Sequence, residues 1–206
     1  KRQKTPPYTE PLEHCESNNH VWSADFKGHF KLKNKRICYP LTITDNKSRF
    51  LLLCQSLART RHMDVQPWFE RSFREYGLPD AIRTDNGPPF SCVGLGGLSR
   101  LAVWWVQLGI WPERIEPGKP QQNPRHERMH RSLKPFCRST GFRGQQKKFD
   151  AFVQEYNWER SHEGIDRQIP GSVYKRSVRE YPRKIASISY ETDHEVRKVK
   201  QSGEIM

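Results

Sequence analysis

Three acidic residues stand in separate, motif-rich segments of the chain. Asp25 lies in VWSADFKGHF, Asp85 in AIRTDNGPPF and Glu127 in PGKPQQNPRHERMHRSLK. Asp25 sits in an alternating strand pattern, Asp85 closes a short buried strand, and Glu127 falls in the first turn of an expected helix. A carboxylate at a strand end points into the crevice beyond the sheet, a usual ligand position in α/β folds. Three hard oxygen ligands from different elements can together hold Mg²⁺ or Mn²⁺ beside a phosphate.

Each carboxylate also has an ordinary explanation when it is taken singly. Asp25 could face solvent from its strand, Asp85 could bond its own backbone in the Asp-Asn-Gly turn, and Glu127 could complement a helix dipole. Taken together, three clustered carboxylates repel one another, and a divalent cation removes that penalty. The metal-site interpretation therefore rests on the joint pattern.

The composition agrees with a partner that is a polyanion. The net charge is +13 over 206 residues, which favours nucleic acid without proving it, because many other proteins are basic. No apolar stretch approaches the ~20 residues that span a bilayer. Five scattered cysteines without a CxxC pair indicate reduced thiols in the cytoplasm, and neither a disulfide framework nor a zinc site.

The order of expected elements is three antiparallel strands, helix, strand, helix, strand, helix, helix. Gly77 should end the first helix, with Pro67 in its first turn, and Asn123 should cap the third helix, with Pro124 at its first position. This order predicts an α/β fold. The expected strands are 21–26, 37–45, 48–57, 81–85 and 110–117, and the expected helices are 63–77, 99–109, 124–138 and 149–160.

The wording of the three acidic segments, together with FREYGLPDAIRTDNGPPF and FVQEYNWERSHEGI, resembles bacterial insertion-sequence transposases of the DDE superfamily, which have a retroviral-integrase-like core. The resemblance implies an RNase H-like fold with a mixed five-stranded sheet, three strands antiparallel and then two parallel, flanked by helices. It places the catalytic core at residues 20–182. Residues 1–19 would be a linker or N-terminal arm, and 183–206 the start of a truncated C-terminal β-domain or a flexible tail.

The resemblance also implies a chemistry. Asp25, Asp85 and Glu127 would be the catalytic residues and would bind two Mg²⁺ (or Mn²⁺) ions, with Asp25 bridging both. The protein would cleave double-stranded DNA at transposon ends and join the 3′-hydroxyl ends to target DNA, as a homo-oligomer (a dimer or larger) in the bacterial cytoplasm, associated with the nucleoid. Pro124 stands where the family usually has glycine.

The helix that carries Glu127 is basic on the same face. Arg131 and Lys134 follow Glu127 at i+4 and i+7, so they can hold neighbouring phosphates, and Lys134 matches a lysine of the resembled integrases. A merely solvated basic face is the alternative. A loop made of Lys119, Gln121, Gln122 and Asn123 would lie over the DNA end.

Other functions remain open from the residues. His126 to His130 reads H-E-x-x-H, the helix signature of zinc peptidases, but three arginines crowd the motif and no third ligand motif follows. The two histidines are more plausible as a packing pair or as phosphate contacts. An RNase H-like nuclease without strand joining, or a catalytically idle DNA-binding protein, would share the same basic core.

Overall fold

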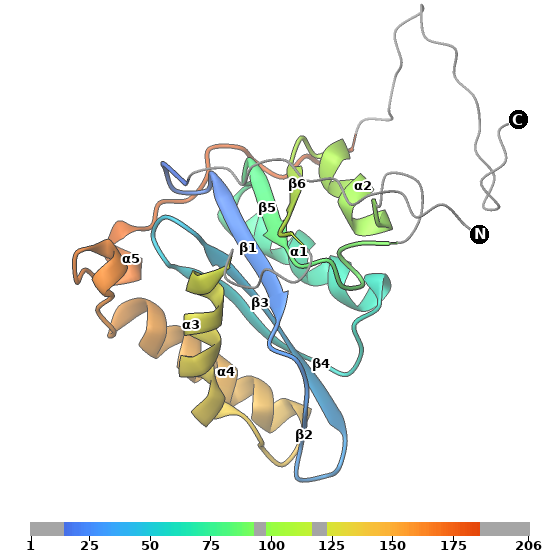
Figure 1. Cartoon of the computed structure of the whole chain (residues 1–206), viewed down its shortest axis with the longest axis vertical. Coiled ribbons are helices and arrows are strands. Elements are labelled where there is room, and N and C mark those ends of the chain that lie inside the picture. Colours follow the sequence, from blue (N-terminus) through green and yellow to red (C-terminus); the bar gives the residue numbers. More distant parts are fainter. Residues whose placement is uncertain (1–14, 93–97, 117–122, 186–206) are drawn as a thin grey trace, which may run out of the picture.

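The structure is a computed structural model and describes residues 15–92, 98–116 and 123–185. The fold is built on one mixed sheet (Figure 1). The strands lie in the order β4-β3-β1-β5-β6. The short β2 pairs with the first two residues of β3, Ile37 and Cys38. β3 is antiparallel to β1, β2 and β4, whereas β5 is parallel to both β1 and β6. The strands are β1 (Val21–Phe26), β2 (Phe30–Lys31), β3 (Ile37–Asp45), β4 (Leu51–Leu57), β5 (Ala81–Thr84) and β6 (Trp111–Arg114).

Helices cover both faces of this sheet. Figure 1 shows α3 and α4, in yellow and orange, grouped apart from α1 and α2, in green. Among the described residues, no helix is both long and apolar enough to cross a bilayer. The helices are α1 (His62–Tyr76), α2 (Arg100–Gln107), α3 (Pro124–Leu133), α4 (Phe142–Trp158) and α5 (Pro170–Val173), with 3₁₀ turns at Lys134–Phe136 and Glu163–Ile165.

The alternation of β3 explains why two separate cores form. Leu41 and Ile43 point to one face and pack with the aromatic side chains of α1 and α2. The alternate residues Thr42 and Thr44 point to the other face, where they meet α3. Successive side chains of a strand point to opposite faces, so one strand serves a large apolar core on one side and a polar contact with α3 on the other.

The outer edge of β4 is covered by amide side chains of α4. Asn157 accepts a hydrogen bond from the Leu51 amide at 2.8 Å and donates to the Leu51 carbonyl at 2.9 Å. Gln146 accepts from the Ser56 amide at 2.9 Å and donates to the Cys54 carbonyl at 2.9 Å. The unpaired groups of an edge strand need partners, and here α4 supplies them in place of a further strand.

The expected elements occur in the predicted order, with corrections at helix ends. The structure adds the short β2 to the five expected strands, which makes six, and adds the short helix α5. α1 ends at Gly77 as expected, but it begins at His62, so Pro67 lies inside the helix and the prediction of a first-turn proline is wrong. α3 stops at Leu133 and tightens into a 3₁₀ turn, because Pro135 has no amide hydrogen to continue the α-helical ladder.

α4 begins earlier than expected, at Phe142. Two glycines, Gly141 and Gly144, weaken the local helical signal. Phe142, however, packs against the smaller apolar core that α4 forms with α3 and β4, and this contact stabilises the extra turns. The RNase H-like α/β architecture itself is as expected. Residues 1–14 and 186–206 lie outside the described residues, so the predicted arm and the predicted C-terminal segment stay predictions.

Candidate active site

Asp25 and Asp85 are placed side by side by the pairing of β1 with β5. These parallel strands pair Val21 with Ala81 and Ser23 with Arg83, and the same register carried two residues further brings Asp25 level with Asp85. Neighbouring strands lie about 4.8 Å apart. The two carboxylates therefore share one end of the sheet. Asp25 points away from Ala24, whose side chain belongs to the opposite, apolar core, as the alternation predicted.

Glu127 reaches the same place because the start of α3 is tied to β1. The Ser23 hydroxyl shares its hydrogen between Asn123 Oδ1, at 3.2 Å, and Asn46 Oδ1, at 3.0 Å. Asn123 directly precedes α3 and Ser23 lies two residues before Asp25. This contact holds the first turn of α3, and with it the exposed Glu127, over the end of β1.

The three carboxylates interact electrostatically. Burial, the charge of Asp85 and the charge of Glu127 raise the pKa of Asp25 from its ordinary value of 3.8 to about 7, against a lowering hydrogen bond from the backbone at Phe26. Both acidic neighbours therefore lie near enough to act on the charge of Asp25. Among the described residues, however, the group whose ligand atoms all lie within 4.8 Å of one another is Asp25 with His126 and His130, and not the three carboxylates. Carboxylate oxygens are the ligands that Mg²⁺ prefers, so the donor set fits a divalent cation.

Asp85 sits in a tight turn directly after β5. Its Oδ1 accepts a hydrogen bond from the Gly87 amide at 3.1 Å, and burial raises its pKa while that bond lowers it. The next residue, Asn86, donates from its side chain to the Ile115 carbonyl at 2.6 Å. The turn is therefore anchored to the chain beyond β6, and a Cβ at Gly87 would come within 3.1 Å of Asp85 Oδ2.

Two histidines of α3 fasten the helix to β3. Thr42 Oγ1 lies 2.7 Å from His126 Nε2 and 2.8 Å from His130 Nε2, and it donates to the Asp25 carbonyl at 3.1 Å. Having donated its single hydrogen, Thr42 accepts from both imidazoles. His126 Nδ1 then accepts from Thr44 Oγ1 at 3.1 Å. The histidines are a packing pair that fixes α3 beside Asp25.

The zinc-peptidase motif is thereby explained in another way. One ligand atom each of Asp25, His126 and His130 falls within 4.8 Å of the others, a spacing that could suit a metal. Both ring nitrogens of the buried His126 already bond threonines. Burial, with the Lys27 charge, lowers the pKa of His130 to about 3, so its 4.0 Å approach to Asp25 is a contact of a neutral imidazole and not an ion pair.

The residues that were expected to contact DNA differ in their position and exposure. Arg131 is exposed on the flank of α3 that also carries Glu127, and Lys134 is exposed at the start of the 3₁₀ turn that follows α3. Asn123 is buried, 8% exposed, and holds Ser23. Lys119, Gln121 and Gln122 lie outside the described residues. The supporting roles of Ser23, Asn46, Thr42 and Thr44 had no motif of their own; only the alternation of threonine along β3 hinted at a polar contact on that face.

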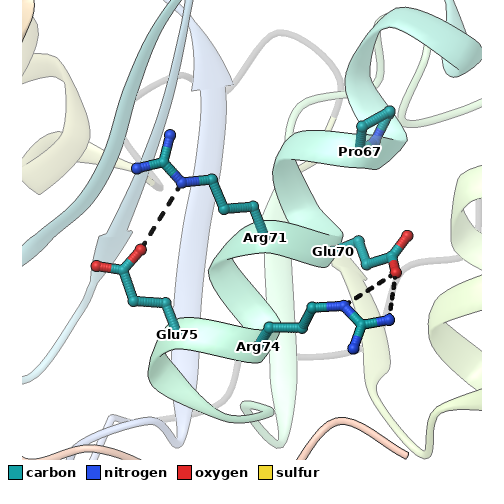
Figure 2. Close-up of a pocket in the computed structure, with 5 residues that line it drawn as sticks. All are labelled: Pro67, Glu70, Arg71, Arg74 and Glu75. Carbon is teal, nitrogen blue, oxygen red and sulfur yellow. Dashed lines mark hydrogen bonds and ion pairs between the residues drawn. The ribbon is translucent and has the colours of Figure 1, made fainter. Parts of the chain in front are cut away.

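A shallow hollow along α1 does not belong to this site. Figure 2 shows that its charged residues pair with one another: Arg74 binds Glu70 at 2.7 Å and Arg71 lies 3.8 Å from Glu75. These pairs join residues one turn apart on the same helix and are exposed.

The five cysteines all lie in the described part of the chain, and every one is a free thiol.

The chain matches known proteins of one kind. A family model described as Integrase core domain matches residues 16–120, and a second model of the same description matches residues 108–170. A 31.7 kDa protein of insertion element IS407 from Burkholderia multivorans is 28% identical over 156 residues, which are 74% of this chain and 54% of that protein. A 39.2 kDa protein of insertion element IS476 from Xanthomonas euvesicatoria is 32% identical over 58% of this chain and 32% of its own length.

Solved structures agree on the fold. The HTLV-2 integrase catalytic core domain, in its trimeric form with magnesium, has a TM-score of 0.53 at 15% identity and covers 77% of this chain and 98% of its own. A chain of the simian T-cell lymphotropic virus intasome, in complex with a PP2A regulatory subunit, has a TM-score of 0.61 at 17% identity and covers 96% of this chain and 68% of its own. The present chain spans about half the length of the IS407 protein. The family model covers half of the chain and the solved structures share its fold, so the chain belongs to the integrase core domain family.

Proposed function

We propose that the chain is the catalytic core of a DDE transposase, which cuts DNA at transposon ends and joins the resulting 3′-hydroxyl ends to target DNA. The proposal is supported by the register of the parallel strands β1 and β5, which puts Asp25 level with Asp85, together with the effect of Asp85 and Glu127 on the pKa of Asp25. Asp85 and Glu127 are 60 and 102 positions from Asp25 in the sequence. The insertion-element relatives support transposition as the biological setting.

The three carboxylates would hold Mg²⁺ or Mn²⁺, two ions in the full site, with Asp25 between Asp85 and Glu127. The metal supplies charge that activates an attacking oxygen and stabilises the leaving 3′-oxygen. Asp25 must lose its proton to serve as a ligand. The neutral His130 beside it adds no positive charge that would compete with the metal.

The rest of the site would position the DNA. Arg131, on the flank of α3 that carries Glu127, and Lys134, in the 3₁₀ turn that follows α3, are both exposed, so they can hold the phosphates on either side of the bond that is cut. Lys119, Gln121 and Gln122 precede α3 in the sequence and would contact the DNA end. DNA ends must be brought together for joining, which a homo-oligomer of this core would achieve.

The test uses labelled duplex DNA with a transposon end, incubated with Mg²⁺, Mn²⁺ or Zn²⁺. We expect nicked and joined products with Mg²⁺ or Mn²⁺ only, and we expect Asp25→Asn, Asp85→Asn and Glu127→Gln each to abolish both. Bulk DNA affinity should persist, because basic residues supply it. Nicks without joined products would identify a plain nuclease instead, and full activity in any of the three variants would remove that residue from the site.

A further inference from the structure

A second basic site lies on the other flank of α3. A cavity of about 450 Å³ opens between α3, the end of α4 and the β3–β4 turn. Four arginines line it from three separate parts of the chain, and Ser132, Tyr156 and Ser161 add hydroxyl groups. We call this cavity the arginine pocket; its arginines are Arg49, Arg125, Arg128 and Arg160.

The helical repeat separates this pocket from the catalytic flank. His126 and Met129 face the sheet and are buried, 1% and 2% exposed. At 100° per residue, Glu127 falls to one side of that buried stripe and Arg128 to the other. α3 therefore presents one basic flank to the catalytic carboxylates and a second basic flank to the arginine pocket.

The described lining of the pocket carries four arginines against one glutamate, so positive charge is in excess. None of its four arginines forms an ion pair with a described carboxylate, although Glu163 also lines the cavity. Arg49 and Arg125 both donate to one acceptor, the Asn46 carbonyl, Arg125 at 2.9 Å. Burial and the neighbouring Arg125 charge lower the pKa of Arg49. Converging guanidinium groups of this kind favour an anion between them.

The arrangement is built by the backbone as well as by side chains. Arg49 has a φ of 67°, a conformation uncommon for residues other than glycine, asparagine and aspartate. Its guanidinium lies against Gly164, where an added Cβ would come within 3.1 Å of Arg49 Nη2. The β3–β4 turn and the 3₁₀ segment Glu163–Ile165 thus restrain the Arg49 side chain at the rim of the cavity.

We infer that the arginine pocket binds a backbone phosphate of double-stranded DNA, at a position separate from the bond that is cut. The inference rests on the proposed function, since DNA is the polyanion that the core would handle. Guanidinium groups match phosphate geometry. A helix with its side chains is about 10–12 Å across, close to the ~12 Å width of the DNA major groove, so one duplex can touch both flanks of α3.

Binding measurements test the inference without any cleavage. The variant Arg128→Ala/Arg160→Ala removes two pocket arginines whose guanidinium groups form no hydrogen bond with the described residues; their backbone hydrogen bonds remain, so the fold should survive. With a labelled duplex and no divalent metal, we expect roughly tenfold weaker binding. We also expect the slope of log K against log salt concentration to fall by about 0.9 for each lost contact.

The matched control is Arg71→Ala/Arg74→Ala on α1. It also removes two positive charges, but from the paired surface in Figure 2. This control should leave the slope nearly unchanged. Equal slopes for the pocket variant and the wild type, or an equal loss in both variants, would overturn the inference.

A second measurement uses the unaltered protein, so it does not depend on the folding of a variant. An arginine-specific dicarbonyl reagent should modify Arg128 and Arg160 in the free protein, and duplex DNA should protect them while Arg71 stays reactive. Absence of protection would overturn the inference and leave the pocket to another acidic partner. Failure of wild-type cutting would count against the proposed function alone, because both measurements here read binding.

Discussion

At the scale of single residues, Asp25 is costly to the protein until its carboxylate has a counter-charge. It is mostly buried, its side chain 27% exposed, and two further carboxylates act on it. The histidine beside it stays neutral and cannot pair with it. Such a group favours its protonated form in the folded protein, and a divalent cation would reverse that preference.

One pH-dependent contribution to stability comes from the raised pKa of Asp25, from 3.8 to about 7. In that window Asp25 binds its proton more tightly in the folded protein than in the unfolded chain, so its contribution to the free energy of unfolding falls as pH rises from about 4 to 7. The buried His126 and His130, whose pKa values are lowered, contribute in the opposite direction, so the comparison with Asp25→Asn isolates the carboxylate. The upper bound is ~4 kcal/mol, which screening at the partly exposed carboxyl reduces to about 2 kcal/mol. Asp25→Asn should therefore be more stable than the metal-free wild type at pH ~8 and equal to it near pH 4.

Urea unfolding at several pH values measures this difference, with the exposed Asp166→Asn as the control. Added Mg²⁺ should stabilise the wild type at the higher pH and have no such effect on Asp25→Asn. A stability difference between the wild type and Asp25→Asn that is constant across the window would mean that Asp25 ionises without cost, and that the cluster needs no cation.

At the scale of elements, the positions of α3 and α4 are set by polar contacts with particular strands. His126 and His130 attach α3 to Thr42 of β3, and Asn157 attaches α4 to Leu51 of β4. These contacts do more than bury apolar area, because they select one alignment of helix on strand. The alignment of α3 is what brings Glu127 to the end of β1.

Asn157 offers a direct test of the covered sheet edge. Asn157→Ala leaves both the amide and the carbonyl of Leu51 buried without their side-chain partner, and each orphaned group costs about 1–3 kcal/mol. We expect a loss of roughly 2–4 kcal/mol in the free energy of unfolding. The exposed Gln154→Ala on the same helix should change it by less than about 0.5 kcal/mol. Similar small losses in both variants would show that water reaches the edge of β4.

At the scale of the whole molecule, part of the net charge of +13 lies on the two flanks of α3, where DNA would lie. Exposed basic residues of α3 flank Glu127, and the arginine pocket occupies the other side of the same helix. α1 also carries arginines, but there they pair with glutamates (Figure 2). The surface therefore separates into a region of free positive charge and a region of compensated charge.

Arg131→Ala and Lys134→Ala should each weaken duplex binding to a similar extent for every DNA sequence. Contacts to phosphate carry no base information, and each lost contact should reduce the salt slope by about one. Titrations at several salt concentrations measure both quantities, and Arg71→Ala serves as the paired-charge control. An unaltered slope would identify this flank of α3 as a solvated basic face.

Much of the catalytic arrangement is readable from the sequence. Asp25 and Asp85 each stand in or directly after a strand with a recognisable period, and the turn residues after Asp85 mark where that strand ends. The periodicity of side chains along a strand already assigns Asp25 to the face opposite Ala24. Element order, the end of α1 at Gly77 and Pro124 at the start of α3 were predicted for the same reason, since they are local signals.

Tertiary structure alone decided which distant residues meet. Thr42 bonds two histidines of α3, Ser23 holds Asn123, and Arg49 shares a cavity with Arg160. Tertiary packing also decided where α4 starts and that Pro67 lies inside α1, in both cases overriding the local helix propensity. Periodicity encodes which face of an element is buried but not what it is buried against, because the pairing of faces depends on the whole sheet. The three carboxylates could therefore be proposed as a site from the sequence and stay a prediction, whereas the arginine pocket could be found only in the folded chain.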